Sequence, residues 1–228
     1  MIVIQFASVV ILGYLLGSIP FGALISRRFA KVDITGYGSG KTGTTNVLRV
    51  AGRKAAALVV CLDLSKGALA VIFAGLIVGR NYLVIGDFGL GLLVAQCLAA
   101  LASMTGHNWS VFLKFKGGRG VATFFGGLIA LCPVVGLFGG EVFIIGAGLT
   151  RFASLGSIAG AVGTYTILVP LTIMNSFPLE YLVYTLIGTI AIIVMHRDNI
   201  ARLIAGKERK LGERTEEIEP PPSKEGTE

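Results

Sequence analysis

The chain has 228 residues, of which 54% are hydrophobic and only 14% are charged. A soluble domain carries about 25% charged residues, so this chain has too few polar side chains to cover a surface that faces water. The composition excludes a disordered chain and a disulfide-stapled secreted module, and it predicts an all-α protein that crosses a membrane several times. The three cysteines lie within apolar runs, where a thiol acts as a small hydrophobe: Cys61, Cys97 and Cys132.

The formal net charge is +7. A basic protein invites a nucleic-acid partner, but here the cations lie in short loops between apolar segments. We therefore expect no nucleic acid, and we interpret the charge as orientation in the membrane together with an anionic substrate.

Five apolar runs approach or exceed the roughly 20 residues that a helix needs to cross a bilayer. The first lacks a cleavage-like small-residue site, so we interpret it as a retained span rather than a signal peptide. The five runs are Ile2–Ile25, Ala55–Gly79, Phe88–Met104, Leu155–Met174 and Leu179–Met195.

A sixth apolar stretch, Val121–Leu149, is long for one span and short for two, and Pro133 lies near its middle. Two short helices would give seven spans and would place 18 of the 20 basic residues on one face. One span would instead leave Arg151 and the basic tail opposite the other basic loops. Because short basic loops stay cytoplasmic, we predict seven transmembrane helices, with the N-terminus outside and the C-terminus cytoplasmic. Residues 1–210 form one domain, and the acidic, proline-rich residues 211–228 are expected to be a disordered tail.

The first polar segment between spans, Gly38–Arg49, reads GSGKTGTTNVLR. Glycines and small hydroxyl residues leave backbone N–H groups free to surround an anion, and Lys41 and Arg49 add charge. A Walker A loop would need a glycine at position 35, where Thr35 stands, so an NTPase is not expected. A flexible glycine linker is the alternative.

The second polar segment, Gly106–Thr123, places Arg119 among three glycines directly before a predicted helix. A helix N-terminus favours an anion, so we expect Arg119 to bind one. For Lys114 the favoured interpretation is a membrane-surface anchor.

Two further pairs of polar residues lie near the same face or within a span. Asp63 and Lys66 share one helix face inside the second span, as either a structural ion pair or a functional pair. His196 and Asn199 are one helical turn apart and can point into the same site. Together the loops predict a site for phosphate groups at the boundary between cytosol and membrane.

Taken in order, these segments resemble the bacterial acyl-phosphate-dependent glycerol-3-phosphate acyltransferase family. That family's pattern reads GSGNxGATNVxR, DxxKG, GHxFPxFLxFKGGKGVAT, a Ser-Leu pair after a basic residue, and HRxNIxRL. The match extends from Gly17 to about Lys210. Arg119 replaces a lysine, and arginine can bind phosphate through two parallel hydrogen bonds. The other departures from the pattern are Lys41, Thr42, Thr44 and Ser110.

The resemblance implies an enzyme of the bacterial cell membrane that transfers a fatty acyl group from acyl phosphate to glycerol 3-phosphate. The products would be 1-acyl-glycerol 3-phosphate and phosphate, without a cofactor or metal, and a soluble enzyme would supply the acyl phosphate. The catalytic residues implied are Ser39, Arg49, Arg119, His196 and Asn199. Those implied in substrate or phosphate binding are Gly38, Gly40, Lys41, Thr45, Asn46, His107, Lys116, Gly117, Gly118 and Ser154.

Two other classes are disfavoured by the residues. Acyltransferases that use a His-x-x-x-x-Asp motif pair the histidine base with an aspartate, but Phe112 follows His107 at that spacing and Ala201 follows His196. A transporter should place its site near the bilayer midplane between repeats, and this chain shows no repeat. No carboxylate is an obvious general base, so we expect the attacking hydroxyl to give its proton to a substrate phosphate.

Overall fold

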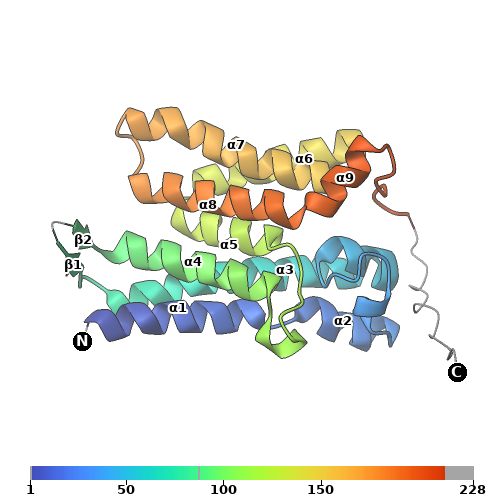
Figure 1. Ribbon diagram of the computed structural model, residues 1–228, viewed down its shortest axis with the longest axis horizontal. Coiled ribbons are helices and arrows are strands. Elements are labelled where there is room, and N and C mark those ends of the chain that lie inside the picture. The colour runs from blue at the N-terminus through green and yellow to red at the C-terminus, as the bar shows by residue number, and fades with distance from the viewer. Residues whose placement is uncertain (1, 87, 214–228) are drawn as a thin grey trace, which may run out of the picture.

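The computed structural model describes residues 2–86 and 88–213, which form a bundle of helices with one small β-hairpin (Figure 1). The helices are α1 (Ile2–Ser18), α2 (Phe21–Ala30), α3 (Thr44–Val78), α4 (Leu92–Asn108), α5 (Val121–Leu131), α6 (Pro133–Thr150), α7 (Ala153–Ile173), α8 (Leu179–Met195) and α9 (Arg197–Ile204). Two short 3-10 helices, η1 (Ile34–Gly36) and η2 (Val111–Leu113), lie in loops, and strands β1 (Leu83–Ile85) and β2 (Phe88–Leu90) pair antiparallel.

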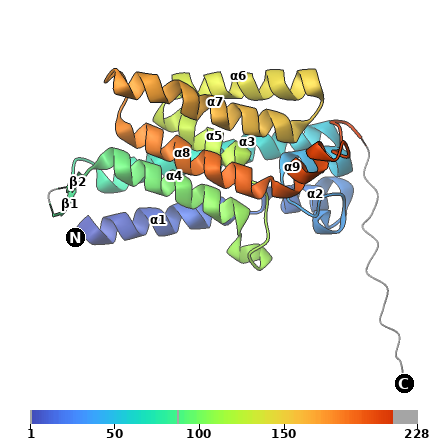
Figure 2. The same ribbon diagram turned by 45° about the horizontal axis from the view of Figure 1, so that its top comes forward.

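The long helices run side by side along the length of the molecule (Figure 1). Helices α2 and α9 lie at one end, which we call the site end, and the N-terminus and the β-hairpin lie at the other. The view in Figure 2 shows α6 and α7 on one side of the bundle, α1 on the opposite side, and α5 and α8 between them.

Four of the described helical segments are long and apolar enough to cross a membrane, or five if the bent pair α8 and α9 counts as one. Many large apolar side chains on these helices are exposed, such as Ile11 at 59%, Leu76 at 76% and Ile144 at 67%. A soluble protein would not expose so many of them, whereas lipid accommodates them. The four segments are Ile2–Ala30, Thr44–Val78, Pro133–Thr150 and Ala153–Ile173.

The break expected at Pro133 is confirmed, because α5 ends at Leu131 and α6 begins at Pro133. Proline fits the first position of a helix, where its missing N–H is not needed. The span expected over residues 2–25 is found as an apolar segment long enough to cross a membrane, Ile2–Ala30, but it is interrupted, since α1 ends at Ser18 and Pro20 precedes α2. Pro20 cannot donate the hydrogen bond that would continue α1.

Two other expected boundaries also differ in the structure. The run expected to begin a helix at Phe88 begins with strand β2, and α4 starts at Leu92, because Gly86 has a φ of +60° and turns the chain into a hairpin. Helix α3 begins at Thr44, before the expected Ala55, and bends at Gly52, whose φ is +82°. Within the expected tail, the Leu211 N–H donates to the Arg151 carbonyl oxygen at 2.7 Å, while residues 214–228 and Asp87 lie outside the described residues.

Small residues let the helices of the bundle approach closely, as is typical of membrane helix pairs. A Cβ at Gly17 of α1 would collide with the backbone of Ser103 on α4. In the centre, the fully buried Tyr184 of α8 stacks on Phe124 of α5 with ring centroids 5.3 Å apart. The Tyr184 hydroxyl donates to the Phe124 carbonyl oxygen at 2.8 Å, so this contact fixes α8 against α5 immediately after the second polar loop.

Candidate phosphate-binding site

A polar pocket opens at the site end, where the starts of α3, α5 and α7 meet α9 and the chain that follows it. Four arginines and one carboxylate line it, together with hydroxyl, amide and imidazole groups. The lining residues are Ser39, Thr45, Arg49, Arg119, Ala153, Ser154, Ser157, His196, Asn199, Arg202, Glu208 and Arg209.

The first polar loop is shaped by Asn46, which is 2% exposed. Its Nδ2 donates to the carbonyl oxygens of Tyr37 at 3.0 Å and Lys41 at 2.9 Å, and its Oδ1 accepts from the Ser39 N–H at 3.4 Å. The glycines on either side of Ser39 have φ values of +58° and +63°, a conformation that other residues adopt at a cost. Asn46 therefore holds the loop in the turn that brings Ser39 to the pocket.

Two arginines from different segments line the same pocket: Arg49 lies in the first turns of α3, and Arg119 lies in the loop before α5. The Arg49 Nη2 donates to the Arg209 carbonyl oxygen at 3.2 Å. The Nε atoms of Arg49 and Arg119 are buried and have no hydrogen-bond partner among the described residues. Burial, and then the neighbouring Arg202, lower the pKa of Arg119 to about 10, so Arg119 remains charged at neutral pH. Buried donors without partners are costly, which favours an anionic ligand here.

The carboxylate of Glu208 joins three elements at one edge of the pocket. Its Oε1 accepts from the Ser154 hydroxyl at 2.9 Å and from the Asn199 amide at 2.6 Å, and its Oε2 accepts from the Arg202 Nε at 2.8 Å. Burial opposes ionisation, but these hydrogen bonds outweigh it and lower the pKa of the Glu208 carboxyl. Glu208 therefore stays ionised and ties α7 to α9 and the segment after it.

His196, between α8 and α9, is 2% exposed. Its Nδ1 lies 2.8 Å from the Ile192 carbonyl oxygen, which accepts hydrogen bonds only, so Nδ1 carries the proton. In the neutral ring Nε2 is then an acceptor. The Asn199 Oδ1 is also buried without a hydrogen-bond partner among the described residues. Two acceptors one helical turn apart suit a ligand that carries hydroxyl groups as well as phosphate.

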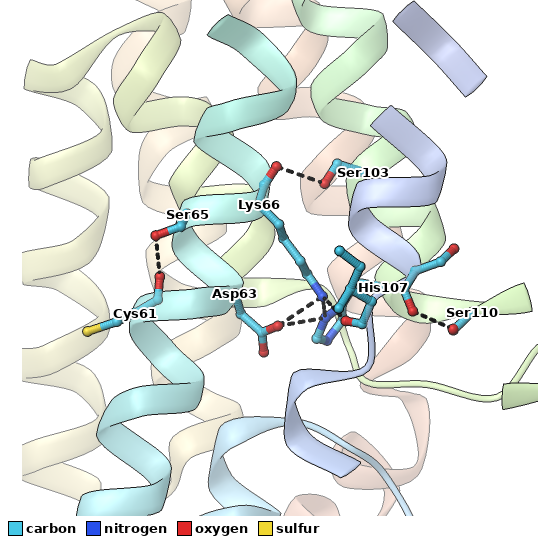
Figure 3. Close-up of polar contacts among 9 residues, drawn as sticks. Cys61, Asp63, Ser65, Lys66, Ser103, His107 and Ser110 are labelled. Carbon is cyan, nitrogen blue, oxygen red and sulfur yellow. Dashed lines mark hydrogen bonds and ion pairs between the residues drawn. The ribbon is translucent and has the colours of Figure 1, made fainter. Parts of the chain in front are cut away.

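A second group of charges lies away from this pocket and is shown in Figure 3. The Lys66 Nζ lies 2.9 Å from the Asp63 Oδ1 and 2.8 Å from the His107 Nδ1. The three side chains are at most 7% exposed. The expected pairing of Asp63 with Lys66 is confirmed, and we call the three residues the buried triad.

The buried triad contacts the second polar loop through His107, which packs against Gly117 and Gly118. The Gly118 N–H donates to the His107 carbonyl oxygen at 3.0 Å, and a Cβ at Gly118 would collide with the His107 ring. A Cβ at Gly117 would collide with the same carbonyl oxygen. Gly117 and Gly118 are therefore needed for close packing on His107. Gly118 directly precedes Arg119, so this packing also positions Arg119.

The structure brings together seven of the predicted site residues and places the others elsewhere. Ser39, Thr45, Arg49, Arg119, Ser154, His196 and Asn199 line the pocket. Gly38, Gly40, Lys41, Asn46, His107, Lys116, Gly117 and Gly118 do not line it. Asn46, His107, Gly117 and Gly118 shape the loops instead, and Lys116 is exposed directly before Gly117.

Sequence reasoning missed Ser157, Glu208 and Arg209 and did not select Arg202 as a site residue. The one available signal was that Glu208 is the only acidic residue in the basic run KERK. Within the described part of the chain, no group of three or more His, Cys, Asp or Glu side chains could hold a metal ion.

The fold and pocket define a helical integral membrane protein with an arginine-rich, polar site at one end of its bundle. The chain matches the family described as "Glycerol-3-phosphate acyltransferase" over residues 7–206. It therefore belongs to that family and is an integral membrane acyltransferase of phospholipid synthesis.

The relatives and solved structures that resemble the chain agree with this assignment. "Glycerol-3-phosphate acyltransferase 3" of Dehalococcoides mccartyi (strain CBDB1) is 63% identical, over 94% of this chain and 99% of that protein. The glycerol-3-phosphate acyltransferase of Thermoanaerobacter pseudethanolicus is 40% identical, over 90% and 96%. The crystal structure of PlsY (YgiH), an integral membrane glycerol 3-phosphate acyltransferase, in its glycerol 3-phosphate form superposes with a TM-score of 0.77. Its sequence is 36% identical to this one, over 91% of this chain and 96% of that one.

Proposed function

We propose that the chain transfers a fatty acyl group from acyl phosphate to glycerol 3-phosphate. The products are 1-acyl-glycerol 3-phosphate and inorganic phosphate, and the reaction is the first step of phospholipid synthesis. The observation that carries the proposal is the excess of cationic donors in the pocket. Four arginines face a single carboxylate there, and two buried Nε donors lack partners among the described residues. A site that holds two phosphorylated molecules needs this excess of positive charge.

Different parts of the pocket bind different parts of the substrates. The side with the two arginines binds the phosphate groups and the acyl carbonyl, and the α8–α9 junction binds the glycerol hydroxyl groups. Arg49 and Arg119 bind phosphate oxygens and polarise the acyl carbonyl, with Ser39 and Thr45 as hydroxyl donors. His196 and Asn199 accept hydrogen bonds from the hydroxyl groups of glycerol 3-phosphate. Ser154 belongs to the same wall through its hydrogen bond to Glu208.

The reaction itself needs no covalent enzyme intermediate. Acyl phosphate is a mixed anhydride, so phosphate is already a good leaving group. The 1-hydroxyl oxygen attacks the acyl carbonyl carbon, the bond from that carbon to the phosphate oxygen breaks, and the hydroxyl proton passes to a phosphate oxygen. The protein contributes by holding the two substrates together and by balancing their charge.

The donor is tested by an assay of the purified protein with glycerol 3-phosphate and either acyl phosphate or acyl-CoA. Release of inorganic phosphate and formation of the acylated product only with acyl phosphate is the expected result. Product formed from acyl-CoA at an equal rate would contradict the proposed donor. An acyl phosphate donor also implies a soluble partner enzyme that forms it.

We also propose that seven helices cross the bacterial cell membrane, with the site end in the cytosol. The test uses single cysteines at Lys207, near the site, and Glu180, at the opposite end, after Cys61, Cys97 and Cys132 are replaced by alanine. A membrane-impermeant maleimide should label position 180 in intact cells and position 207 only after lysis. Labelling of position 207 from outside would overturn this topology.

A further inference from the structure

The chain between α4 and the second glycine loop, Trp109–Lys116, exposes a row of large apolar side chains. We call this segment the aromatic hairpin. Its exposed apolar residues are Trp109 at 42%, Val111 at 42%, Phe112 at 60% and Phe115 at 63%. None of them lines the phosphate pocket, so the proposed reaction does not account for them.

The aromatic hairpin has a defined shape. The Ser110 carbonyl oxygen accepts from the N–H groups of Leu113 at 3.1 Å and Phe115 at 2.8 Å, and Ser110 forms a bridge with Lys116. Lys114 and Phe115 have φ values of +52° and +59°, a left-handed conformation that is unfavourable for residues other than glycine. The fold keeps this strained turn although it exposes Phe115, so that exposure is a fixed feature of the structure.

Two hydrogen bonds fix the depth of the aromatic hairpin along α1. The Ser110 hydroxyl donates to the Ser18 carbonyl oxygen at 2.6 Å, and the Tyr14 hydroxyl donates to the Trp109 carbonyl oxygen at 2.8 Å. At 1.5 Å per residue, Tyr14 and Ser18 lie about 18 and 24 Å from Ile2 along the helix. The hydrocarbon core of a bilayer is about 30 Å thick. With Ile2 at one boundary, the two attachment points lie about 6 to 12 Å inside the other boundary, so the base of the hairpin lies within the leaflet at the site end rather than in open water.

The hairpin also projects sideways from the bundle. In Figures 1 and 2 the green segment after α4 extends beyond α1 rather than beyond the site end. The neighbouring face of α1 is itself apolar and exposed, with Ile11 at 59% and Leu15 at 41%. The apolar surface of the hairpin therefore continues a surface that faces lipid.

We propose that the aromatic hairpin is an interfacial anchor, inserted among the lipids of the leaflet at the site end. Tryptophan and other amphipathic aromatic rings favour the level of the headgroups, and Lys114 and Lys116 can reach anionic headgroups while their stems remain apolar. The hairpin leads directly into Gly117 and Gly118. Its insertion therefore holds the loop that carries Arg119 at the lipid surface.

Trp109 is the only tryptophan of the chain, so the native protein carries its own depth probe. The full chain is reconstituted in vesicles whose phosphatidylcholine carries bromine at shallow, middle or deep positions of the acyl chain. The anchor predicts that Trp109 fluorescence falls most with the shallow bromine, by about half, and only slightly with aqueous iodide, as for a ring in the interfacial belt.

Two reference proteins calibrate the result. Trp109→Phe/Ile11→Trp places the probe on the exposed face of α1 and should respond most to deeper bromine. Trp109→Phe/Lys207→Trp places it near the pocket and should respond to iodide alone. A third protein, Trp109→Phe/Phe115→Trp, should repeat the shallow profile of Trp109, because both residues belong to one hairpin.

The proposal fails if Trp109 behaves as position 207 does, with strong quenching by iodide and none by brominated lipid. A partner protein in water would then be the occupant to seek. Strongest quenching by the deepest bromine would also overturn it, since the hairpin would then lie in the core of the bilayer. Neither outcome depends on the acyl donor, so failure of the anchor is distinguishable from failure of the proposed reaction.

Discussion

The chain holds two clusters of charge that differ in how each is neutralised. In the buried triad, Lys66 lies within 2.9 Å of both the Asp63 carboxylate and the His107 ring. In the phosphate pocket, four arginines and a single carboxylate are the charged lining groups in the part of the chain that the structure describes. The triad is complete without a ligand, whereas the pocket is not.

This difference separates a structural role from a binding role among residues of the same chemical types. The triad is at most 7% exposed and supports the second glycine loop through His107. The pocket opens at the site end and leaves buried donors on Arg49 and Arg119 without partners among the described residues. We therefore expect changes in the triad to alter stability, and changes to the pocket arginines Arg49 and Arg119 to alter activity.

The largest expected effect follows from removing one charge of the triad. Asp63→Leu leaves Lys66 buried without its carboxylate, and breaking such a pair typically costs about 3–5 kcal/mol. The thermal unfolding temperature in detergent should fall sharply. The double variant Asp63→Leu/Lys66→Met should recover most of the loss, because neither charge remains. A double variant no more stable than the single one would contradict a self-neutralising pair.

The next effect concerns phosphate binding. Arg119→Ala removes a charge-assisted contact worth about 1.5–3 kcal/mol, a loss of roughly 10- to 150-fold in kcat/KM, with little change in unfolding temperature. Arg49→Ala should behave in the same way. Arg119→Lys should be mild, since lysine keeps the charge.

Lys114→Ala is the matched control for Arg119→Ala, because Lys114 is an exposed cation outside the pocket only five positions away. Its kcat/KM should stay near the wild-type value. An effect as large as that of Arg119→Ala would show that the whole basic loop, rather than the pocket, carries the function.

A smaller effect is expected at His196 if it positions the substrate rather than removing its proton. His196→Asn keeps hydrogen-bonding capacity, so we expect a loss of about tenfold, below the 10²–10⁴-fold typical of a general base. The acidic limb of the pH–rate profile should be unchanged, and His196→Ala should lose more activity. A profile whose acidic limb disappears in His196→Asn would identify His196 as the base.

The smallest effect is expected at Glu208. The pKa of Glu208 is lower in the folded protein than the ordinary glutamate pKa of 4.5. Ionised Glu208 therefore stabilises the fold fully at pH values above 4.5. That contribution is lost as the pH falls through the lowered folded-state pKa. Glu208→Gln should reduce the unfolding temperature slightly at pH 7 and flatten its dependence on pH below about 4.5. An unchanged pH dependence would mean that Glu208 does not link α7 and α9 in solution.

Local patterns predicted much of the fold and roughly half of the site. The polar segment Gly38–Arg49 predicted Arg49 as a cation for an anion, the family resemblance added Ser39, and both line the pocket. Pro133 predicted the break between α5 and α6. The break after Ser18 was missed although Pro20 marks it, because apolar residues continue on both sides of the proline.

The remaining features depend on contacts between distant segments. His107 meets Lys66 across 41 positions of sequence, and Glu208 meets Ser154 across 54. Nothing near either residue in the sequence specifies its partner, because helix packing decides it. The predicted role of His107 in substrate binding therefore stays a prediction, while its visible contacts are with the triad and the second loop.

The most direct test of the contrast between the two clusters is equilibrium binding of radiolabelled glycerol 3-phosphate to the protein in lipid nanodiscs. Wild type and Asp63→Leu/Lys66→Met should bind with similar affinity, provided that both are folded by their unfolding temperatures. Arg119→Ala should bind at least about tenfold more weakly. Unchanged affinity in Arg119→Ala, with affinity lost in the folded double variant, would place the substrate at the triad and contradict this account.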